Sequence, residues 1–224
     1  VIDIDGRVVA LNAGASQAAA SSFFLPLDRI ARALRLLQQD QPVPRGHLGA
    51  VFTYRAYDEL RRLGLREATE AATRRAFPDG TGMLVVSEVV PGTPADGRLE
   101  VGDILVSVAG QAVSEFVPLE ALLDARVGAE APVAIERNGV PLVVAVPVQD
   151  LEAVSPAEYL QFGDAVVHDL SLQQARHFNR PPRGVYVANP GFVLASAGIP
   201  RGALLVGVDG APVAGIGDLE ATLD

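Results

Sequence analysis

Serines, carboxylates and three histidines are the residues of this sequence that could carry out catalysis. The histidines are His47, His168 and His177. A serine nucleophile needs a histidine base and often stands in a glycine-flanked turn such as Gly-x-Ser-x-Gly. No serine of this chain has that setting, and Ser21 and Ser22 lie in an apolar, strand-like stretch with no evident base beside them. We therefore predict no catalytic residue in this chain.

The histidines also raise the question of a metal site. His168 and His177 lie near Asp164 and Asp169, but nine positions separate the two histidines and no third nitrogen ligand is visible. The tight helical spacing of metal-binding histidines is missing. The chain has no cysteine, which excludes thiolate catalysis, disulfides and cysteine-based zinc sites. We predict structural histidines, no metal and no cofactor.

Composition and charge narrow the class of protein. Hydrophobic residues make up 49% of the 224 residues and charged residues 20%, which is enough to build globular cores. The 18 basic residues, all arginine, face 27 acidic ones, for a net charge of −9. Such a surface repels phosphate, so we expect no nucleic-acid partner. No apolar run approaches the ~20 residues of a membrane helix, so we expect no transmembrane segment.

The first 44 residues contain several short elements. The chain starts without a methionine or a signal-like segment, so Val1 looks like the site of a cut. Alternating apolar residues and turn signals predict a hairpin, a loop, a strand, a helix and a linker, in this order: Val1 to Leu11 with Gly6 in the turn, Asn12 to Gln17, Ser22 to Leu27, Leu27 to Gln38, and Asp40 to Pro44.

An internal repeat organises the rest of the chain. GDILVSVAGQAV begins at Gly102 and resembles GALLVGVDGAPV, which begins at Gly202, at an offset of 100 residues. Leu119-Glu120-Ala121 and Leu219-Glu220-Ala221 match at the same offset. A duplicated domain explains this pattern. The counterpart of Ala125 to Val148 is missing after the helix that ends at Asp224, so we expect the second copy to be truncated.

The first copy carries two further signals. Asn138-Gly139 between apolar runs predicts a β-hairpin from Pro132 to Val148. Gly64 interrupts the helical pattern from Tyr57 to Phe77, in which arginines alternate with acids. A solvated, ion-paired helix face explains this pattern better than a basic patch for a membrane or an acidic partner. We expect Leu60, Leu63 and Leu65 to fill the core.

The segment from Val89 to Val113, VVPGTPA followed by LEVGDIL and VAGQAV, resembles PDZ domains of the bacterial kind. PDZ domains bind an extended peptide between a sheet edge and a helix, and a glycine-containing loop holds the terminal carboxylate with backbone N–H groups. The resemblance implies that the loop is Arg45, Gly46, His47, Leu48, Gly49 and Ala50, that Ala50 to Tyr54 is the strand, and that Leu119, Leu122 and Leu123 of the helix Pro118 to Ala125 form the other wall. His47 would lie beside the peptide end, with either a binding role or none.

In the second copy we take Leu160 to Asp164 as the equivalent loop. It places Asp164 where a peptide carboxylate would arrive, so we expect this copy to bind free C-termini poorly.

The opening segment, VIDIDGRVVALNAG followed by ASSFFLPLDRIARAL, resembles the end of the trypsin-like domain of HtrA (Deg) serine endopeptidases, just after the catalytic serine. The second copy, with FGDAVVHDLSLQQARHFN, is similar to the branch with PDZ-like tandems that includes fungal relatives. The family's triad would lie upstream of Val1. The resemblance implies that Leu11 to Gly14 and Ser21 to Leu25 line the substrate cleft, which gives these cleft residues: Leu11, Asn12, Ala13, Gly14, Ser21, Ser22 and Phe23.

These inferences predict an α+β chain that is mainly β. It would contain the end of a trypsin-like β-barrel domain (1–40), a PDZ domain (41–150) and a truncated PDZ-like domain (151–224). The resemblance implies a non-catalytic region of an HtrA-like endopeptidase in protein quality control, with peptide or unfolded-protein substrates. The intact protein would be a homo-oligomer of the bacterial cell envelope. The alternatives are a peptide-binding scaffold without a triad and a chaperone-like protein that works through its sheet edge.

Overall fold

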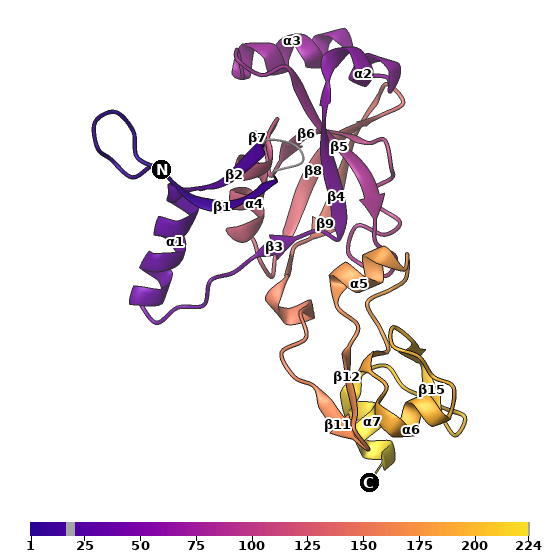
Figure 1. Ribbon diagram of the computed structural model, residues 1–224. Coiled ribbons are helices and arrows are strands. Elements are labelled where there is room, and N and C mark those ends of the chain that lie inside the picture. The colour runs from indigo at the N-terminus through magenta and orange to yellow at the C-terminus, as the bar shows by residue number, and fades with distance from the viewer. Residues whose placement is uncertain (17–20, 224) are drawn as a thin grey trace. The chain divides into compact units, whose positions relative to one another are not determined.

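The computed structural model describes residues 1–16 and 21–223 (Figure 1). It divides into two compact units, Val1–Pro44 and Arg45–Asp224, here called the N-terminal and the C-terminal unit. Both units contain strands and helices, with strands in the majority, which confirms the expected α+β class. No helix of the described residues has both the length and the apolar character needed to cross a membrane.

The N-terminal unit is a two-stranded hairpin followed by a helix. Strand β1 (Ala10–Ser16) pairs antiparallel with β2 (Ser21–Pro26), and α1 (Leu27–Gln38) follows where the helical spacing predicted it. The expected loop from Asn12 to Gln17 is wrong for the residues that the structure describes, because Asn12 to Ser16 belong to β1. A bulge between Asn12 and Gly14 accommodates these poor strand formers within the ladder.

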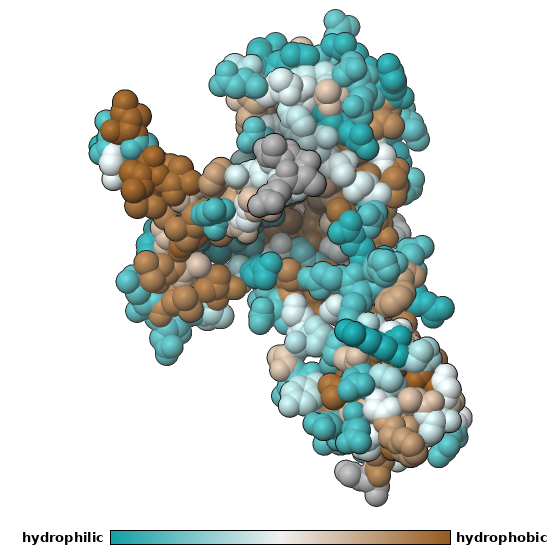
Figure 2. Space-filling model, in the orientation of Figure 1, coloured by the Kyte–Doolittle hydropathy of each residue, from teal (hydrophilic) through white to brown (hydrophobic). Residues whose placement is uncertain are grey.

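The segment before β1 is less regular than predicted. Of the expected hairpin between Val1 and Leu11, a single bridge between Ile2 and Val8 is present. The carboxylate of Asp3 accepts hydrogen bonds from the N–H groups of Asp5 and Arg7 and so shapes the turn. Many large apolar side chains of this unit are exposed, Ile4 completely, and Figure 2 shows hydrophobic residues gathered over it.

The first copy of the repeat is built around one antiparallel sheet. The strand order is β4-β5-β6-β8-β9, with β7 also paired to β6. The bounds are β4 (Ala50–Ala56), β5 (Gly82–Val89), β6 (Ile104–Val108), β7 (Gln111–Ala112), β8 (Glu130–Arg137) and β9 (Val140–Pro147). Asn138 and Gly139 both have positive φ, at 50° and 80°, and form the predicted hairpin turn between β8 and β9.

Three helices accompany this sheet: α2 (Tyr57–Arg62), α3 (Glu67–Ala76) and α4 (Phe116–Asp124). Gly64, at a φ of 97°, separates α2 from α3, as the sequence predicted. Leu60 and Leu65 are buried as expected, but Leu63 is 39% exposed. It is the cap residue that follows α2, where the chain turns toward Gly64 and its side chain leaves the buried face. α4 covers the main core, which is formed by Leu84, Leu105, Val108, Val133, Ile135 and Val146 among others.

One arginine of α2 and one of α3 are bound to the same acid. Glu70 pairs with Arg61 at 2.6 Å and with Arg74 at 2.8 Å, in agreement with an ion-paired helix face. Arg66, just before α3, pairs with Glu136 of β8 at 2.7 Å, and that carboxylate is almost completely buried. The hydroxyl group of Thr69 also donates to Glu136. Burial opposes a charge on Glu136, but the Arg66 N–H, the Thr69 hydroxyl and the Arg66 guanidinium outweigh it, so its pKa is lowered.

The second copy repeats part of this plan. Its sheet has the order β11-β12-β13-β14. The bounds are β11 (Leu160–Phe162), β12 (Ala165–Asp169), α5 (Leu172–His177), β13 (Val185–Asn189), α6 (Gly191–Ser196), β14 (Leu204–Leu205), β15 (Gly207–Val208), β16 (Ala211–Pro212) and α7 (Ile216–Leu223). Ala109-Gly110 and Asp209-Gly210 have almost the same positive φ angles. The sequence repeat is therefore also a structural repeat at this turn.

Candidate functional site

The loop before β4 in the first copy is tied to the end of α4. Gly46 and His47 form a short strand, β3 (Gly46–His47), which pairs with β10 (Gln149–Asp150). The Gly46 N–H donates to Oδ1 of the buried Asp124 at 2.8 Å. A Cβ atom on Gly46 would collide with the carbonyl group of Leu123. Glycine therefore allows the loop backbone to lie directly against the last residues of the helix.

The carbonyl groups of this loop are occupied by hydrogen bonds from the segment after β5. The Gly49 oxygen accepts from the Val90 N–H at 2.9 Å, and the Leu48 oxygen accepts from the Ala95 N–H at 2.9 Å. Within the described part of the chain, the N–H groups of Leu48 and Gly49 have no acceptor. Gly49 has a φ of 81°, which L side chains rarely adopt. Two neighbouring free N–H groups in a glycine-containing loop form a site suited to an anion.

Strand β4 begins where this loop ends and lies at the edge of the sheet. It pairs with β5 from Ala50, opposite Val89, to Ala56, opposite Gly82. Among the described strands, none pairs with its other edge. An unpaired edge offers backbone groups to an added strand, and the free N–H groups of Leu48 and Gly49 lie just before its first residue.

The side chains predicted for the peptide pocket lie in and beside the main core. Leu48, Leu119 and Leu123 are at most 5% exposed and belong to the core itself. Ala50 and Leu122 are half-buried and pack against it. The structure thus brings loop, strand and helix residues together, with Leu48, Leu119 and Leu123 beneath the surface and Ala50 and Leu122 above them.

His47 and Arg45 differ in their surroundings. Both ring nitrogens of His47 are buried and have no hydrogen-bond partner among the described residues. Burial lowers the pKa of His47, and the nearby Asp150 carboxylate opposes this effect. The exposed Arg45 donates its backbone N–H to Asp150 Oδ1 at 3.2 Å, and its carbonyl group accepts from Leu151.

The residues predicted for a substrate cleft meet in the hairpin of the N-terminal unit. Leu11 pairs with Leu25, Asn12 with Phe24, and Gly14 with Phe23, while Ala13 lies at the bulge. Ser22 pairs with Ala15, and Ser21 with Ser16. Leu11 and Phe23 are exposed, at 47% and 59%.

The two remaining histidines have ordinary structural contacts. Nδ1 of His168 is 2.7 Å from the carbonyl oxygen of Asp169, and its ring lies 5.2 Å from that of Tyr186. The His177 ring contacts Phe178 edge-on. Among the described residues, no group of three or more His, Cys, Asp or Glu side chains is placed to hold a metal ion.

The loop predicted for the second copy is wrong. Leu160 to Phe162 form β11, and Gly163 and Asp164, both with positive φ, make the tight turn into β12. Asp164 is therefore a turn residue. A two-residue Gly-Asp turn between apolar residues is a hairpin signal that the sequence already contained.

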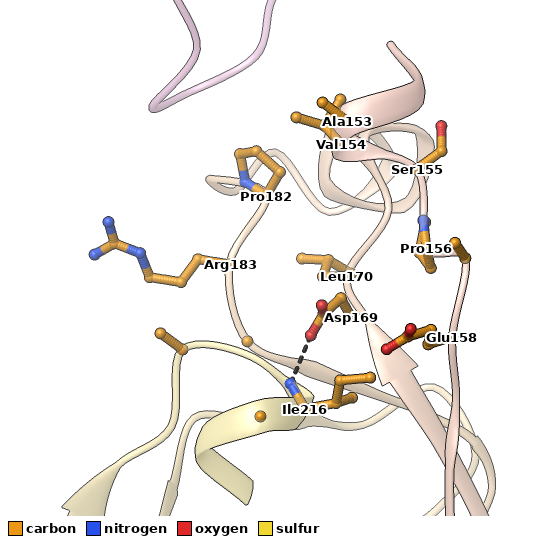
Figure 3. Close-up of a pocket in the computed structure, with 14 residues that line it drawn as sticks. Ala153, Val154, Ser155, Pro156, Glu158, Asp169, Leu170, Pro182, Arg183 and Ile216 are labelled. Atoms are coloured by element: carbon orange, nitrogen blue, oxygen red, sulfur yellow. Dashed lines mark hydrogen bonds between the residues drawn. The ribbon is translucent and has the colours of Figure 1, made fainter. Parts of the chain in front are cut away.

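Two other acids, Glu158 and Asp169, lie near the start of α7 and line a recess of about 500 Å³ (Figure 3). The Glu158 carboxylate points toward Asp169 and Ile216, and Asp169 Oδ1 accepts the Ile216 N–H at 2.6 Å. Glu158 makes no hydrogen bond or ion pair with its side chain among the residues that the structure describes. The sequence analysis considered Asp169 only as a possible metal ligand, and Glu158 did not stand out because it lies outside the repeated motif.

The fold and the loop geometry define a protein with PDZ-type domains. Two family models match the chain: "PDZ domain" over residues 85–137 and "PDZ-like domain" over residues 153–223. Protease Do-like 7 of Arabidopsis thaliana is 49% identical and covers 100% of this chain, which in turn covers 21% of that protein. The pro-apoptotic serine protease NMA111 of Candida glabrata is 40% identical over 84% of this chain and 19% of its own length.

A solved structure described as the HtrA-type protease AlgW with decapeptide matches at a TM-score of 0.45. Its sequence is 22% identical, over 65% of this chain and 42% of that one. The chain belongs to the HtrA-like family and carries its PDZ region. It spans about a fifth of the length of the two protease relatives. These relatives come from a plant and a fungus, so they do not support the expected bacterial cell envelope.

Proposed function

We propose that the first copy of the repeat binds an extended peptide with an apolar residue and a free carboxylate at its C-terminus. The carboxylate would accept hydrogen bonds from the N–H groups of Leu48 and Gly49. The peptide backbone would then pair with the free edge of β4. The observation that carries this proposal is the pair of N–H groups without an acceptor, placed just before a strand with one unpaired edge.

The terminal side chain of the peptide would enter between β4 and α4. Ala50 and Leu122 would contact it, and Leu48, Leu119 and Leu123 would form the floor beneath. Arg45, Gly46 and His47 complete the loop. Burial of one Val- or Leu-sized side chain contributes about 1.5 to 3 kcal/mol, so the dissociation constant would be micromolar at best once ordering costs are subtracted.

In the intact protein this peptide binding would serve proteolysis. The domains would span 1–40, 41–150 and 151–224, and the Leu11 to Phe23 hairpin would line the cleft of a trypsin-like domain. Exposed C-termini of damaged proteins would be captured by the PDZ domain and presented to a serine triad, within a homo-oligomer. The family membership of the chain supports this role.

The test is a calorimetric titration of the chain with an apolar peptide and with its C-terminal amide. We expect the amide to bind at least about tenfold more weakly, because it lacks the charge that the two N–H groups would hold. Equal affinities would show that the loop does not bind a carboxylate. A peptide-binding scaffold with no protease partner would give the same titration result. Adding the family's protease segment in trans distinguishes the two roles, because peptide hydrolysis would then support the proteolytic one.

Two variants locate the binding site on the protein. Leu122→Asp places a charge on the half-buried wall of α4, and we expect it to abolish binding. Ala121→Asp places the same charge on the neighbouring, exposed position of the same helix and serves as the matched control. If both variants bind like the parent chain, the groove between β4 and α4 is not the site.

A further inference from the structure

A second recess combines apolar walls with two arginines, and all of its lining residues but Gly92 belong to the second copy. Its volume is about 640 Å³, and it lies beside the segment that joins α5 to β13. Leu204, Val206 and Pro212 line it, together with Pro181 and Pro182. Val206 is 61% exposed, although it is a large apolar residue. The prolines have a fixed φ, so this wall is rigid before any ligand arrives.

The charged side chains at this recess are Arg180, Arg183 and Asp218. The Asp218 carboxylate already accepts the Ala214 N–H at 2.8 Å. Neither arginine has an ion pair among the described residues. In Figure 3, Arg183 points away from Glu158 and Asp169, although all three line the adjoining recess. Other arginines, Arg75 and Arg201 among them, also have no ion pair among the described residues, so Arg180 and Arg183 are distinguished by their position at an apolar recess.

We propose that this recess binds a peptide segment in which a carboxylate side chain lies next to an apolar one. The apolar side chain would contact Leu204, Val206 and the prolines, and the carboxylate would pair with Arg180 or Arg183. Planar guanidinium groups hold carboxylates with two parallel hydrogen bonds. The site lies outside the groove between β4 and α4, so it is independent of the proposed C-terminal peptide binding.

The negative net charge of the chain favours a peptide ligand over a nucleic acid or an anionic membrane. A net charge of −9 repels nucleic acids and anionic membranes as a whole. Two arginines at one recess are enough to attract a single carboxylate, because that interaction acts within about 10 Å at ordinary ionic strength. A client segment with one carboxylate beside an apolar side chain therefore fits the recess.

The experiment measures the fluorescence anisotropy of a labelled peptide of leucines and serines with a single central glutamate, amidated at its C-terminus. We expect saturable binding to the full chain, and the loss of about fivefold or more in affinity in Arg180→Gln/Arg183→Gln. The matched control is Arg75→Gln/Arg201→Gln, which removes the same charge from exposed arginines that do not line the recess. Equal affinities of the two double variants would overturn the proposal.

Three further arms separate the alternatives. Val206→Asp should weaken binding, and Leu122→Asp should leave it unchanged, because that residue belongs to the other groove. The same peptide with lysine in place of its glutamate should bind far more weakly, and an equal affinity would overturn the charge argument. Vesicles of phosphatidylserine should not bind, and competition of such vesicles with the glutamate peptide would assign the arginines to a lipid surface instead.

Discussion

The Gly46 N–H and the Asp124 carboxylate are joined by a 2.8 Å hydrogen bond that holds the candidate peptide loop to the last residue of α4. This contact orients the loop, because the carbonyl groups of Leu48 and Gly49 are bound on its other side. The free N–H groups of Leu48 and Gly49 are therefore held in place by the Gly46 hydrogen bond and by the hydrogen bonds of these two carbonyl groups.

Removal of the Asp124 carboxylate should weaken both the fold and the site. We expect Asp124→Ala to lower the free energy of unfolding by about 1 to 3 kcal/mol, because the buried Gly46 N–H loses its acceptor. Urea unfolding measures this loss. Asp79→Ala changes an exposed aspartate of the same copy and should have almost no effect. Equal stabilities of the two variants would contradict the structural role of Asp124.

Substitutions of Gly49 and Gly110 allow the energetic cost of backbone strain to be measured apart from the cost of a steric clash. Both have a φ near 80°, but a Cβ on Gly49 would collide with Thr93, whereas nothing lies within 4 Å of a Cβ on Gly110. We expect Gly110→Ala to cost about 1 to 2 kcal/mol of unfolding free energy from the φ angle alone. Gly49→Ala should cost clearly more. The two thermal unfolding curves measure the difference, and an equal cost would show that the Thr93 contact does not constrain the loop.

The free energy of unfolding should decrease at low pH because Glu136 becomes protonated. Its pKa is lowered in the folded chain, so its contribution is complete above the unfolded pKa of about 4.3 and is lost as the pH falls through the folded value. Glu136→Gln should be less stable at neutral pH and should lose less stability on acidification. Urea unfolding across this pH range measures both effects. Glu130→Gln, an exposed position on the same strand, should keep the acid dependence of the parent chain.

Amide hydrogen exchange should be slow in the strands of the main sheet and fast in the first residues of the chain. We expect strong protection in Leu84 to Val89, Ile104 to Val108 and Val143 to Val148, which lie in β5, β6 and the end of β9. Val1 to Leu11 should exchange quickly, because only a few backbone hydrogen bonds hold it and most of its side chains are exposed. Protection of that segment as strong as in β5, in a monomer at low concentration, would show that it has a folded context of its own.

The sequence predicted those elements that local chemistry determines. Asn138-Gly139 allows only a tight hairpin turn, Gly64 ends a helix, and the apolar spacing from Leu27 to Gln38 fits one helix face. The repeat located matching turns at Gly110 and Gly210. The candidate loop followed from its glycines and its resemblance to PDZ domains, and in the structure it lies just before the edge strand β4.

The sequence could not predict features that depend on distant partners. Asn12 to Ser16 contains poor strand formers, and they pair because β2 lies opposite. Asp124 carries no motif, and its role appears only when Gly46, 78 positions away, comes within hydrogen-bond distance. Arg180 and Arg183 flank two prolines in the sequence, and only the fold shows that they line an apolar recess and have no ion pair among the described residues.

The most direct test of the carboxylate loop is a nuclear magnetic resonance titration of the ¹⁵N-labelled chain with an apolar peptide. The amide resonances of Leu48 and Gly49 should move the most with the free acid, because their N–H groups would donate to the carboxylate, and should move little with the C-terminal amide. Unchanged Leu48 and Gly49 resonances while the peptide binds elsewhere, for example at β11, would contradict the proposed function.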